Sequence, residues 1–125
     1  YLLDSDQPII DSPEKAVELL ADIRDKKQEY FVCLTLDGAN RLIAKRVVTI
    51  GTLTASLVHP REVFADAIAD RAASIIVAHN HPSGSLRPSQ VDITTTERLK
   101  HAGELLGVPL VYHLLITKQS FRIID

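Results

Sequence analysis

Two histidines and an aspartate form the pattern with the clearest chemical meaning in this sequence. His79 and His81 are separated by one residue at the end of an apolar run, and Asp92 lies eleven positions after His81. On an extended backbone, residues i and i+2 point to the same side, so both imidazoles can face one point. Two nitrogen ligands and one carboxylate oxygen suit zinc and leave a fourth position for water, which is the catalytic arrangement. The pattern therefore predicts a catalytic zinc site.

The same residues also have interpretations that need no metal. A histidine in a folded protein is more often structural than a metal ligand. Ser89 and Asp92 match the Ser-x-x-acid form of a helix capping box. Pro82, Gly84 and Pro88 could serve only to shape a loop, although they also stiffen it and so help to preorganise ligands. Both uses of Asp92 are compatible if Ser89 caps the helix while the carboxylate turns toward the metal.

The composition is that of an ordinary globular domain. The chain has 125 residues, 46% of them apolar and 24% charged, with a formal net charge of -2, which argues against disorder and against a nucleic-acid-binding surface. The single cysteine, Cys33, excludes an intrachain disulfide and a thiolate-rich structural zinc site, and its apolar neighbours predict a buried, unreactive thiol. No run is long enough to span a membrane and no secretory signal is recognised, so we expect a cytoplasmic protein. The chain begins at Tyr1 rather than Met, which is compatible with a longer protein.

Hydrophobic patterns predict helices that alternate with strands. Ser12-Pro13-Glu14 predicts the start of a helix, with a capping hydroxyl, a proline at the first helical position and then an acidic residue. This helix is expected to end near residues 24–27. Further helices are predicted from Pro60 and over residues 89–106. Strands are predicted over residues 29–36, 42–50, 52–58, 74–78, 110–116 and 121–124, with a hairpin joining the first two. This order indicates an α/β domain with helices covering a mixed sheet, in which reactive loops follow the carboxyl ends of central strands.

Several segments resemble a known family. His-x-His-Pro followed by Asp92 is the JAMM metalloprotease signature, and LDGANRLI, GTLTASLVHPREVF and AHNHPSG closely resemble the RadC-type JAMM domain, a bacterial family traditionally labelled as DNA repair proteins. The resemblance extends from about Glu29 to Ile116. It implies one domain over residues 1–125, an αβα layered fold related to the cytidine deaminases, and Zn2+ held by the two histidines, Asp92 and a water.

The resemblance also implies two catalytic residues. Glu29 lies just before a hydrophobic strand, which is the place of the family's glutamate, a proton shuttle. Ser89 lies three residues before Asp92, which is the place of the serine that stabilises the oxyanion. Without the resemblance, Glu29 is a solvated residue between a helix and a strand, and Ser89 is a plain helix cap. We therefore expect a zinc-dependent peptidase or isopeptidase, with a peptide or isopeptide as its partner.

The remaining polar candidates are expected to have structural roles. His59 precedes a proline and is expected to cap or pack against a helix, whereas His101 is expected to be exposed in the middle of one. Arg61 and Glu62 are interpreted as a surface ion pair, and Asn80 is expected to orient the loop of the site.

One position departs from the family pattern. Relatives usually carry Asp-His where this chain has Tyr112-His113 in a predicted strand. The departure leaves the predicted metal ligands intact. It puts in doubt any supporting role that a carboxylate at this place would have.

Two other functions fit parts of the sequence. A non-catalytic zinc-binding accessory of DNA repair or recombination agrees with the family's traditional label. However, no helix-hairpin-helix region, which often precedes the domain, is recognised in these 125 residues, and the net charge gives DNA binding no support. A nucleobase deaminase would share the expected fold. Deaminases require His-x-Glu and Pro-Cys-x-x-Cys, so the His-x-His pattern and the single cysteine exclude this class. The oligomeric state is left open.

Overall fold

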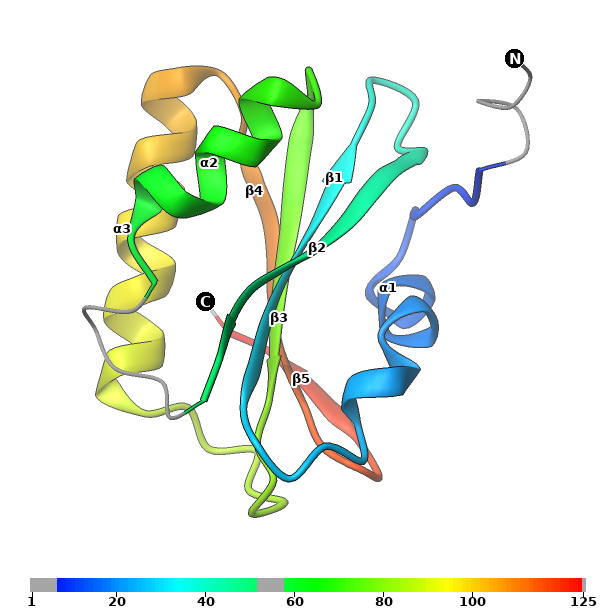
Figure 1. The fold of residues 1–125 in the computed structure, drawn as a ribbon, viewed down its shortest axis with the longest axis vertical. Coiled ribbons are helices and arrows are strands. Elements are labelled where there is room, and N and C mark those ends of the chain that lie inside the picture. The colour runs from blue at the N-terminus through cyan, green and yellow to red at the C-terminus, as the bar shows by residue number, and fades with distance from the viewer. Residues whose placement is uncertain (1–6, 52–57, 125) are drawn as a thin grey trace.

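The computed structural model describes residues 7–51 and 58–124. Its helices and strands are α1 (Pro13–Leu19), the 3-10 helix η2 (Ala21–Ile23), β1 (Tyr30–Leu36), β2 (Leu42–Ile50), α2 (Pro60–Ala69), β3 (Ser74–Asn80), α3 (Gln90–Leu106), β4 (Leu110–Ile116) and β5 (Phe121–Ile123). The strands form a sheet in the order β2-β1-β3-β4-β5, in which β3 and β4 are parallel and the other neighbours antiparallel. Helix α1 covers one face of the sheet and α2 and α3 cover the other (Figure 1). The predicted α/β fold with three layers and a mixed sheet is confirmed.

The first helix is shorter than the sequence predicts. Its regular part ends at Leu19 rather than near residues 24–27. The backbone N–H of Leu20 bonds to the carbonyl of Val17, three residues back, and the chain tightens into η2. Both Leu20 and Ile23 are fully buried, so the tighter turn keeps two large apolar side chains in the core.

The predicted strand ends agree with the structure except beside the histidines. Strand β3 continues past the predicted end at Ala78 through His79 and Asn80, because both residues pair with the neighbouring strand β4. The ends of the other described strands differ from the prediction by at most one residue. The strand predicted over residues 52–58 lies outside the described residues, apart from Val58, which belongs to no strand.

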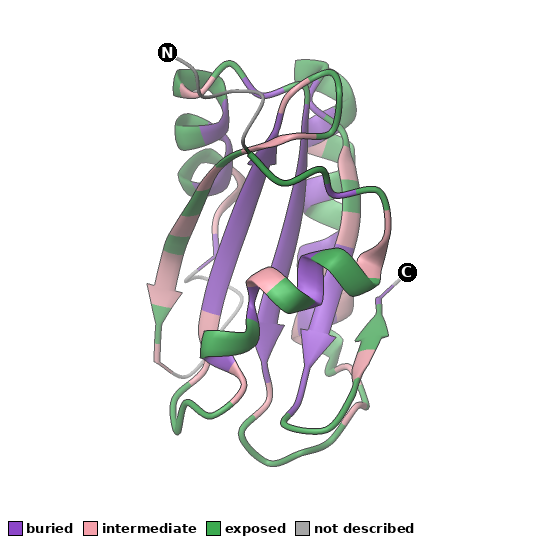
Figure 2. Ribbon diagram, turned by 90° about the vertical axis from the view of Figure 1, so that its right-hand side faces the viewer, coloured by how far each residue is buried: buried purple, intermediate pink, exposed green. Residues whose placement is uncertain are grey.

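Side chains of the central strands alternate between two cores. Leu34 and Ile76 belong to the core under α1, whereas Cys33 and Val77 belong to the core under α2 and α3. Every residue of β3 is buried, as expected for a strand in the middle of a sheet (Figure 2). Burial also raises the pKa of the Cys33 thiol to about 12, with nearby acidic residues adding to the effect. The expected burial of the cysteine is confirmed.

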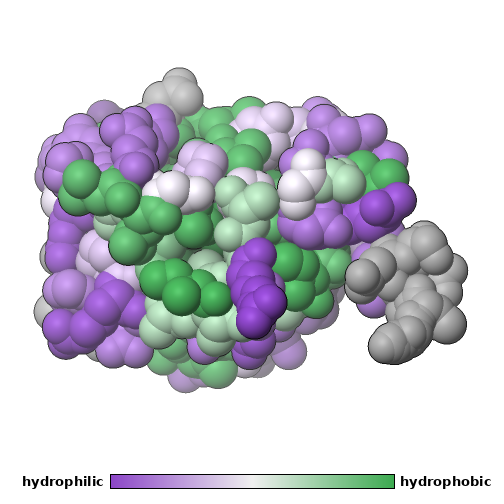
Figure 3. Space-filling model, turned by 90° about the horizontal axis from the view of Figure 1, so that it is seen from above, coloured by the Kyte–Doolittle hydropathy of each residue, from purple (hydrophilic) through white to green (hydrophobic). Residues whose placement is uncertain are grey.

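The end of the sheet opposite the histidines has an apolar surface. The loop after β3 and the start of α3 lie at the lower end in Figure 1. Figure 3 views the opposite end, where hydrophobic residues occupy much of the middle of the surface. Exposed apolar side chains of α2 and α3 include Ile68, Leu105 and Leu106. Among the described residues, no helix combines the length and apolarity that crossing a membrane requires.

Gly103 allows α3 to pack closely against the chain that enters β4. A Cβ atom on this residue would lie 2.6 Å from the backbone oxygen of Val108. We expect Gly103→Ala to lower the free energy of unfolding by about 1 to 3 kcal/mol, the usual cost of overpacking, although alanine favours a helix. Urea unfolding measures the loss. Gly38→Ala is the control, because a Cβ atom there meets nothing within 4 Å; an equal loss at both positions would contradict the packing argument.

Candidate metal centre

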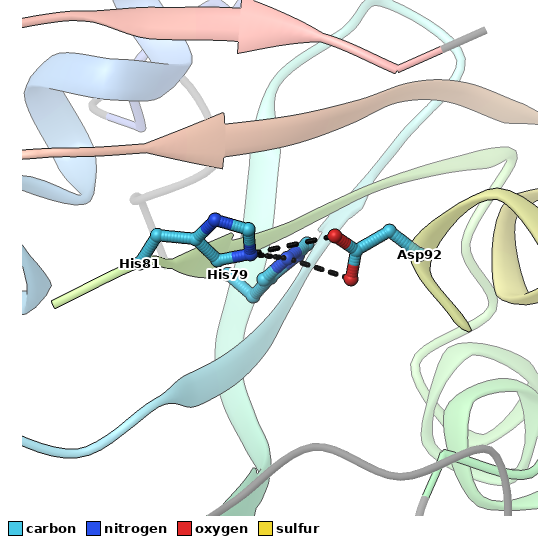
Figure 4. A group of neighbouring side chains, drawn as sticks. All are labelled: His79, His81 and Asp92. Atoms are coloured by element: carbon cyan, nitrogen blue, oxygen red, sulfur yellow. Dashed lines mark hydrogen bonds and ion pairs between the residues drawn. The ribbon is translucent and has the colours of Figure 1, made fainter. Parts of the chain in front are cut away.

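His79, His81 and Asp92 converge on one point. Figure 4 shows the two imidazoles, carried by β3 and the residue after it, facing the carboxylate from the first turn of α3. His79 Nε2 lies 3.1 Å from His81 Nε2 and 3.0 Å from Asp92 Oδ1, and His81 Nε2 lies 3.4 Å from Asp92 Oδ2. A tetrahedral ion with bonds of about 2.0 to 2.1 Å holds its ligand atoms roughly 3.3 Å apart. The chemistry and spacing of the three donors therefore fit a metal ion.

His79, His81 and Asp92 are called the metal group below, because they could hold a metal ion. The capping box at the start of α3 shares Asp92 with this group. Ser89 Oγ accepts a hydrogen bond from the Asp92 N–H at 3.1 Å, and Asp92 Oδ2 accepts one from the Ser89 N–H at 2.8 Å. Asp92 Oδ1 remains directed at His79. The cap thus fixes the orientation of the carboxylate that faces the imidazoles, and the two interpretations of Asp92 are compatible.

The Asp92 carboxylate carries its negative charge in a buried place. Burial opposes ionisation of Asp92, but its close polar contacts with His79 and His81 hold the pKa of its carboxyl well below the usual value. The hydrogen bond with Asp92 raises the pKa of His81 against the effect of burial. The side chains of His79 and Asp92 are each 1% exposed, so solvent screens the group little. A cation that displaces the proton on His81 would find an anionic ligand in place.

His113 on β4 contacts His79 Nδ1, the ring nitrogen of His79 that does not face Asp92. Its Nε2 lies 3.0 Å from His79 Nδ1, and its Nδ1 contacts Thr96 Oγ1, which donates to the Asp92 carbonyl at 2.8 Å. Burial lowers the pKa of His113 to about 3, so the imidazole is neutral. The Thr96 hydroxyl already donates its proton to the Asp92 carbonyl, so in the contact with His113 it must act as acceptor. His113 Nδ1 therefore donates to Thr96, and His113 Nε2 accepts a hydrogen bond from His79 Nδ1. This chain of hydrogen bonds leaves the Nε2 lone pair of His79 for the metal.

Sequence reasoning gave neither His113 nor Thr96 a role at this site. A histidine in an otherwise apolar predicted strand was the available signal, but the sequence does not show that β4 lies beside β3. Tyr112, the residue at which the sequence departs from the expected family pattern, packs against the core under α1. The departure from the family pattern therefore lies on the opposite face of the sheet from the metal group.

A cleft of about 590 Å³ opens beside the group. Glu29 and Ser89, the two predicted catalytic residues, line it together with His81 and Asp92. Glu29 Oε1 lies 3.8 Å from His81 Nε2, and the Glu29 side chain is 25% exposed. The structure thus brings both residues to the same cleft as the metal group.

The other polar candidates lie away from the cluster. His59 caps α2 by accepting a hydrogen bond from the Arg61 N–H, as expected, and Arg61 and Glu62 form an exposed ion pair at 3.8 Å. His101 is exposed on α3. The side chain of Asn80 bonds to Gln28, before β1, and to Tyr30, the first residue of β1. The expected contact was with the loop that follows Asn80.

The fold and the metal group define the class of protein. A mixed sheet covered by helices, with His-x-His at a strand end and an aspartate in the next helix, is the arrangement of a JAMM or JAB domain. The family profile described as RadC-like JAB domain matches residues 10–123. The chain belongs to this family.

Relatives occur in archaea and bacteria. The chain is 56% identical to a UPF0758 protein of Methanospirillum hungatei over 99 residues, which are 79% of this chain and 44% of the relative. It is 49% identical to a UPF0758 protein of Bacillus licheniformis over 117 residues, 93% of this chain and 52% of the relative. It is also 49% identical to UPF0758 protein YsxA of Bacillus subtilis over 114 residues, 90% of this chain and 49% of the relative. The chain spans about half the length of the curated relatives it matches.

Proposed function

We propose that this domain is a zinc-dependent metallohydrolase that cleaves an amide or isopeptide bond in a peptide substrate. The main support is the group of three donors with tetrahedral spacing at the side of a cleft. Two imidazole nitrogens favour zinc over magnesium or calcium, which prefer oxygen ligands. Three protein ligands leave one coordination place for water or substrate, whereas a structural zinc site is closed by four.

Glu29 acts as the general acid and base in this proposal. Zinc, when bound, supplies a Lewis acid that lowers the pKa of water to about 7. Glu29 accepts a proton from the attacking water and passes it to the leaving amine. The carboxylate lies at the cleft within 3.8 Å of His81 and is partly exposed, so water and substrate can reach it.

Ser89 stabilises the oxyanion in this proposal. Its Oγ uses a lone pair to accept the Asp92 N–H, and the hydroxyl proton is separate from that bond. Because Ser89 lines the cleft, this proton can be donated to an oxygen of the substrate. A donor of this kind typically contributes about 3 to 4 kcal/mol to the transition state.

Glu29→Gln tests the proposal most directly. We expect hydrolysis to slow by about 100- to 10,000-fold, the usual range for a lost general base, while zinc content stays at the wild-type level. The measurement combines metal analysis of the purified protein with cleavage of a library of peptides and isopeptide-linked peptides.

Glu62→Gln is the matched control, because it makes the same chemical change in an exposed residue outside the cleft. We expect this variant to keep full activity. A Glu29→Gln protein that cleaves at the wild-type rate would remove Glu29 from the mechanism. Salt-dependent DNA binding without cleavage of any peptide would instead favour the non-catalytic accessory function.

A further inference from the structure

Asn80 lies between the two histidines of the His-x-His pattern, but its side chain has a different task. Side chains alternate along a strand, so Asn80 points to the face of the sheet opposite the metal group. Its side chain is buried, and Asn80 Oδ1 accepts a hydrogen bond from the Tyr30 N–H at 2.6 Å. Its Nδ2 donates to the Gln28 carbonyl at 2.9 Å and to the Lys26 carbonyl at 3.5 Å. The amide therefore binds two backbone carbonyls of the segment before β1 and the N–H of the first residue of β1.

At the start of β1, hydrogen bonds to the Asn80 side chain take the place of the regular backbone pairing between β1 and β3. The last backbone pair between β1 and β3 joins Phe31 to His79. Beyond it, the Tyr30 N–H and the Gln28 carbonyl bond to the side chain of Asn80, the last residue of β3. The Asn80 side chain thus continues the contact between β3 and the chain that enters β1 past the last backbone pair.

The two bonded backbone groups flank Glu29. The Gln28 carbonyl belongs to the peptide plane before Glu29, and the Tyr30 N–H belongs to the plane after it. Because peptide groups are planar, fixing both planes fixes the φ and ψ of Glu29 and the direction of its side chain. The carbonyl of Glu29 also accepts a hydrogen bond from the Gly51 N–H at 2.9 Å, which holds the second plane from the other side.

We infer that Asn80 is a positioning residue that holds the Glu29 carboxylate at the cleft. The inference rests on the proposed function, in which Glu29 transfers the proton. Asn80 thus links the strand that carries the metal group to the segment that carries the general base. One strand residue sets their relative positions without itself touching the metal group.

The chemistry of the contact requires both halves of an amide. The Tyr30 N–H needs an acceptor and the Gln28 carbonyl needs a donor. Asn80→Asp keeps the acceptor but places a carboxylate oxygen against the Gln28 carbonyl, which repels it. Asn80→Ala removes both bonds. The two variants therefore separate the contributions of the two planes.

The test compares these variants with Asp37→Ala. Asp37 accepts hydrogen bonds from the Ala39 and Arg41 N–H groups in a turn away from the cleft, so its loss is a matched loss of backbone bonds. We expect the Tyr30 amide to exchange about 10-fold faster in Asn80→Ala, and less so in Asn80→Asp, with zinc affinity unchanged in both. Asp37→Ala should change neither the exchange of Tyr30 nor zinc affinity.

Activity gives a second measurement, made on a peptide that the wild-type protein cleaves. A misplaced general base should lower kcat by about 10- to 100-fold with little change in KM. Asn80→Ala should have almost no further effect in a Glu29→Gln background, because both changes disable the same group. Additive losses, unchanged Tyr30 exchange, or loss of zinc in Asn80→Ala would each overturn the inference.

The inference and the proposed function can fail separately. If the wild-type protein cleaves no peptide, the proposed function fails. The positioning claim is then decided by Tyr30 exchange and by the Glu29 carboxylate in crystal structures of the zinc-loaded wild type and Asn80→Ala. A carboxylate in the same place in both structures would refute the claim, and a displaced one would support it.

Discussion

Asp92→Asn is expected to weaken zinc binding by more than about 100-fold, since changing even an outer partner of a ligand costs about 10- to 100-fold. The substitution preserves size, and the asparagine oxygen can still accept the Ser89 N–H that closes the cap of α3. It removes the negative charge that faces His79 and His81 and offers a neutral, weaker ligand. Competition with a chromophoric chelator measures the affinity, and a circular dichroism melt of the metal-free protein verifies the fold.

Asp22→Asn provides the comparison for this prediction. Asp22 forms an ion pair with Lys45 at 2.6 Å, and its side chain is 59% exposed. Neutralising it should leave zinc affinity unchanged, because the pair lies on the α1 side of the sheet, away from the cluster. If Asp92→Asn binds zinc as tightly as the wild type, the three side chains form only a hydrogen-bonded cluster.

His113→Phe is expected to weaken zinc binding by about 10- to 100-fold, although His113 does not face the metal position. The substitution keeps a flat ring and removes the acceptor for His79 Nδ1. The proton of His79 is then free to move to Nε2, the atom that faces Asp92 and the metal position. Thr96→Val should act in the same direction, because it removes the hydroxyl that receives the proton of His113.

The tautomer of His79 gives a second measurement. In the wild-type protein, 15N chemical shifts should show the proton of His79 on Nδ1, and in His113→Phe that preference should be lost. His101→Phe makes the same change at an exposed position of α3 and should alter neither the tautomer nor the affinity. Wild-type zinc affinity in both His113→Phe and Thr96→Val would show that His113 only fills space.

Local sequence determined the parts of the site that lie close together along the chain. The His-x-His spacing places His79 and His81 on one face because strand side chains alternate, whatever surrounds the strand. Ser89 and Asp92 define the start of α3 because a capping box depends only on residues three apart. The same local rules located most helices and strands to within a residue.

Two predicted element ends were wrong because contacts with distant segments, by burial in one case and by strand pairing in the other, overrode the local pattern. The first helix ends early, where burial of Leu20 and Ile23 favours a tighter turn. Strand β3 extends through Asn80, because neighbouring strands satisfy its backbone beyond the apolar run. Neither effect can be read from residues within one segment.

Tertiary structure alone decided which distant side chains meet. His113 contacts His79 only because β4 lies parallel to β3, and Glu29 comes near His81 only because β1 pairs with the other side of β3. Strand order depends on packing energy summed over the whole sheet and not on the residues of any one strand. The sequence therefore specified the types and local spacing of the candidate metal ligands, while the sheet selected the residues that support and surround them.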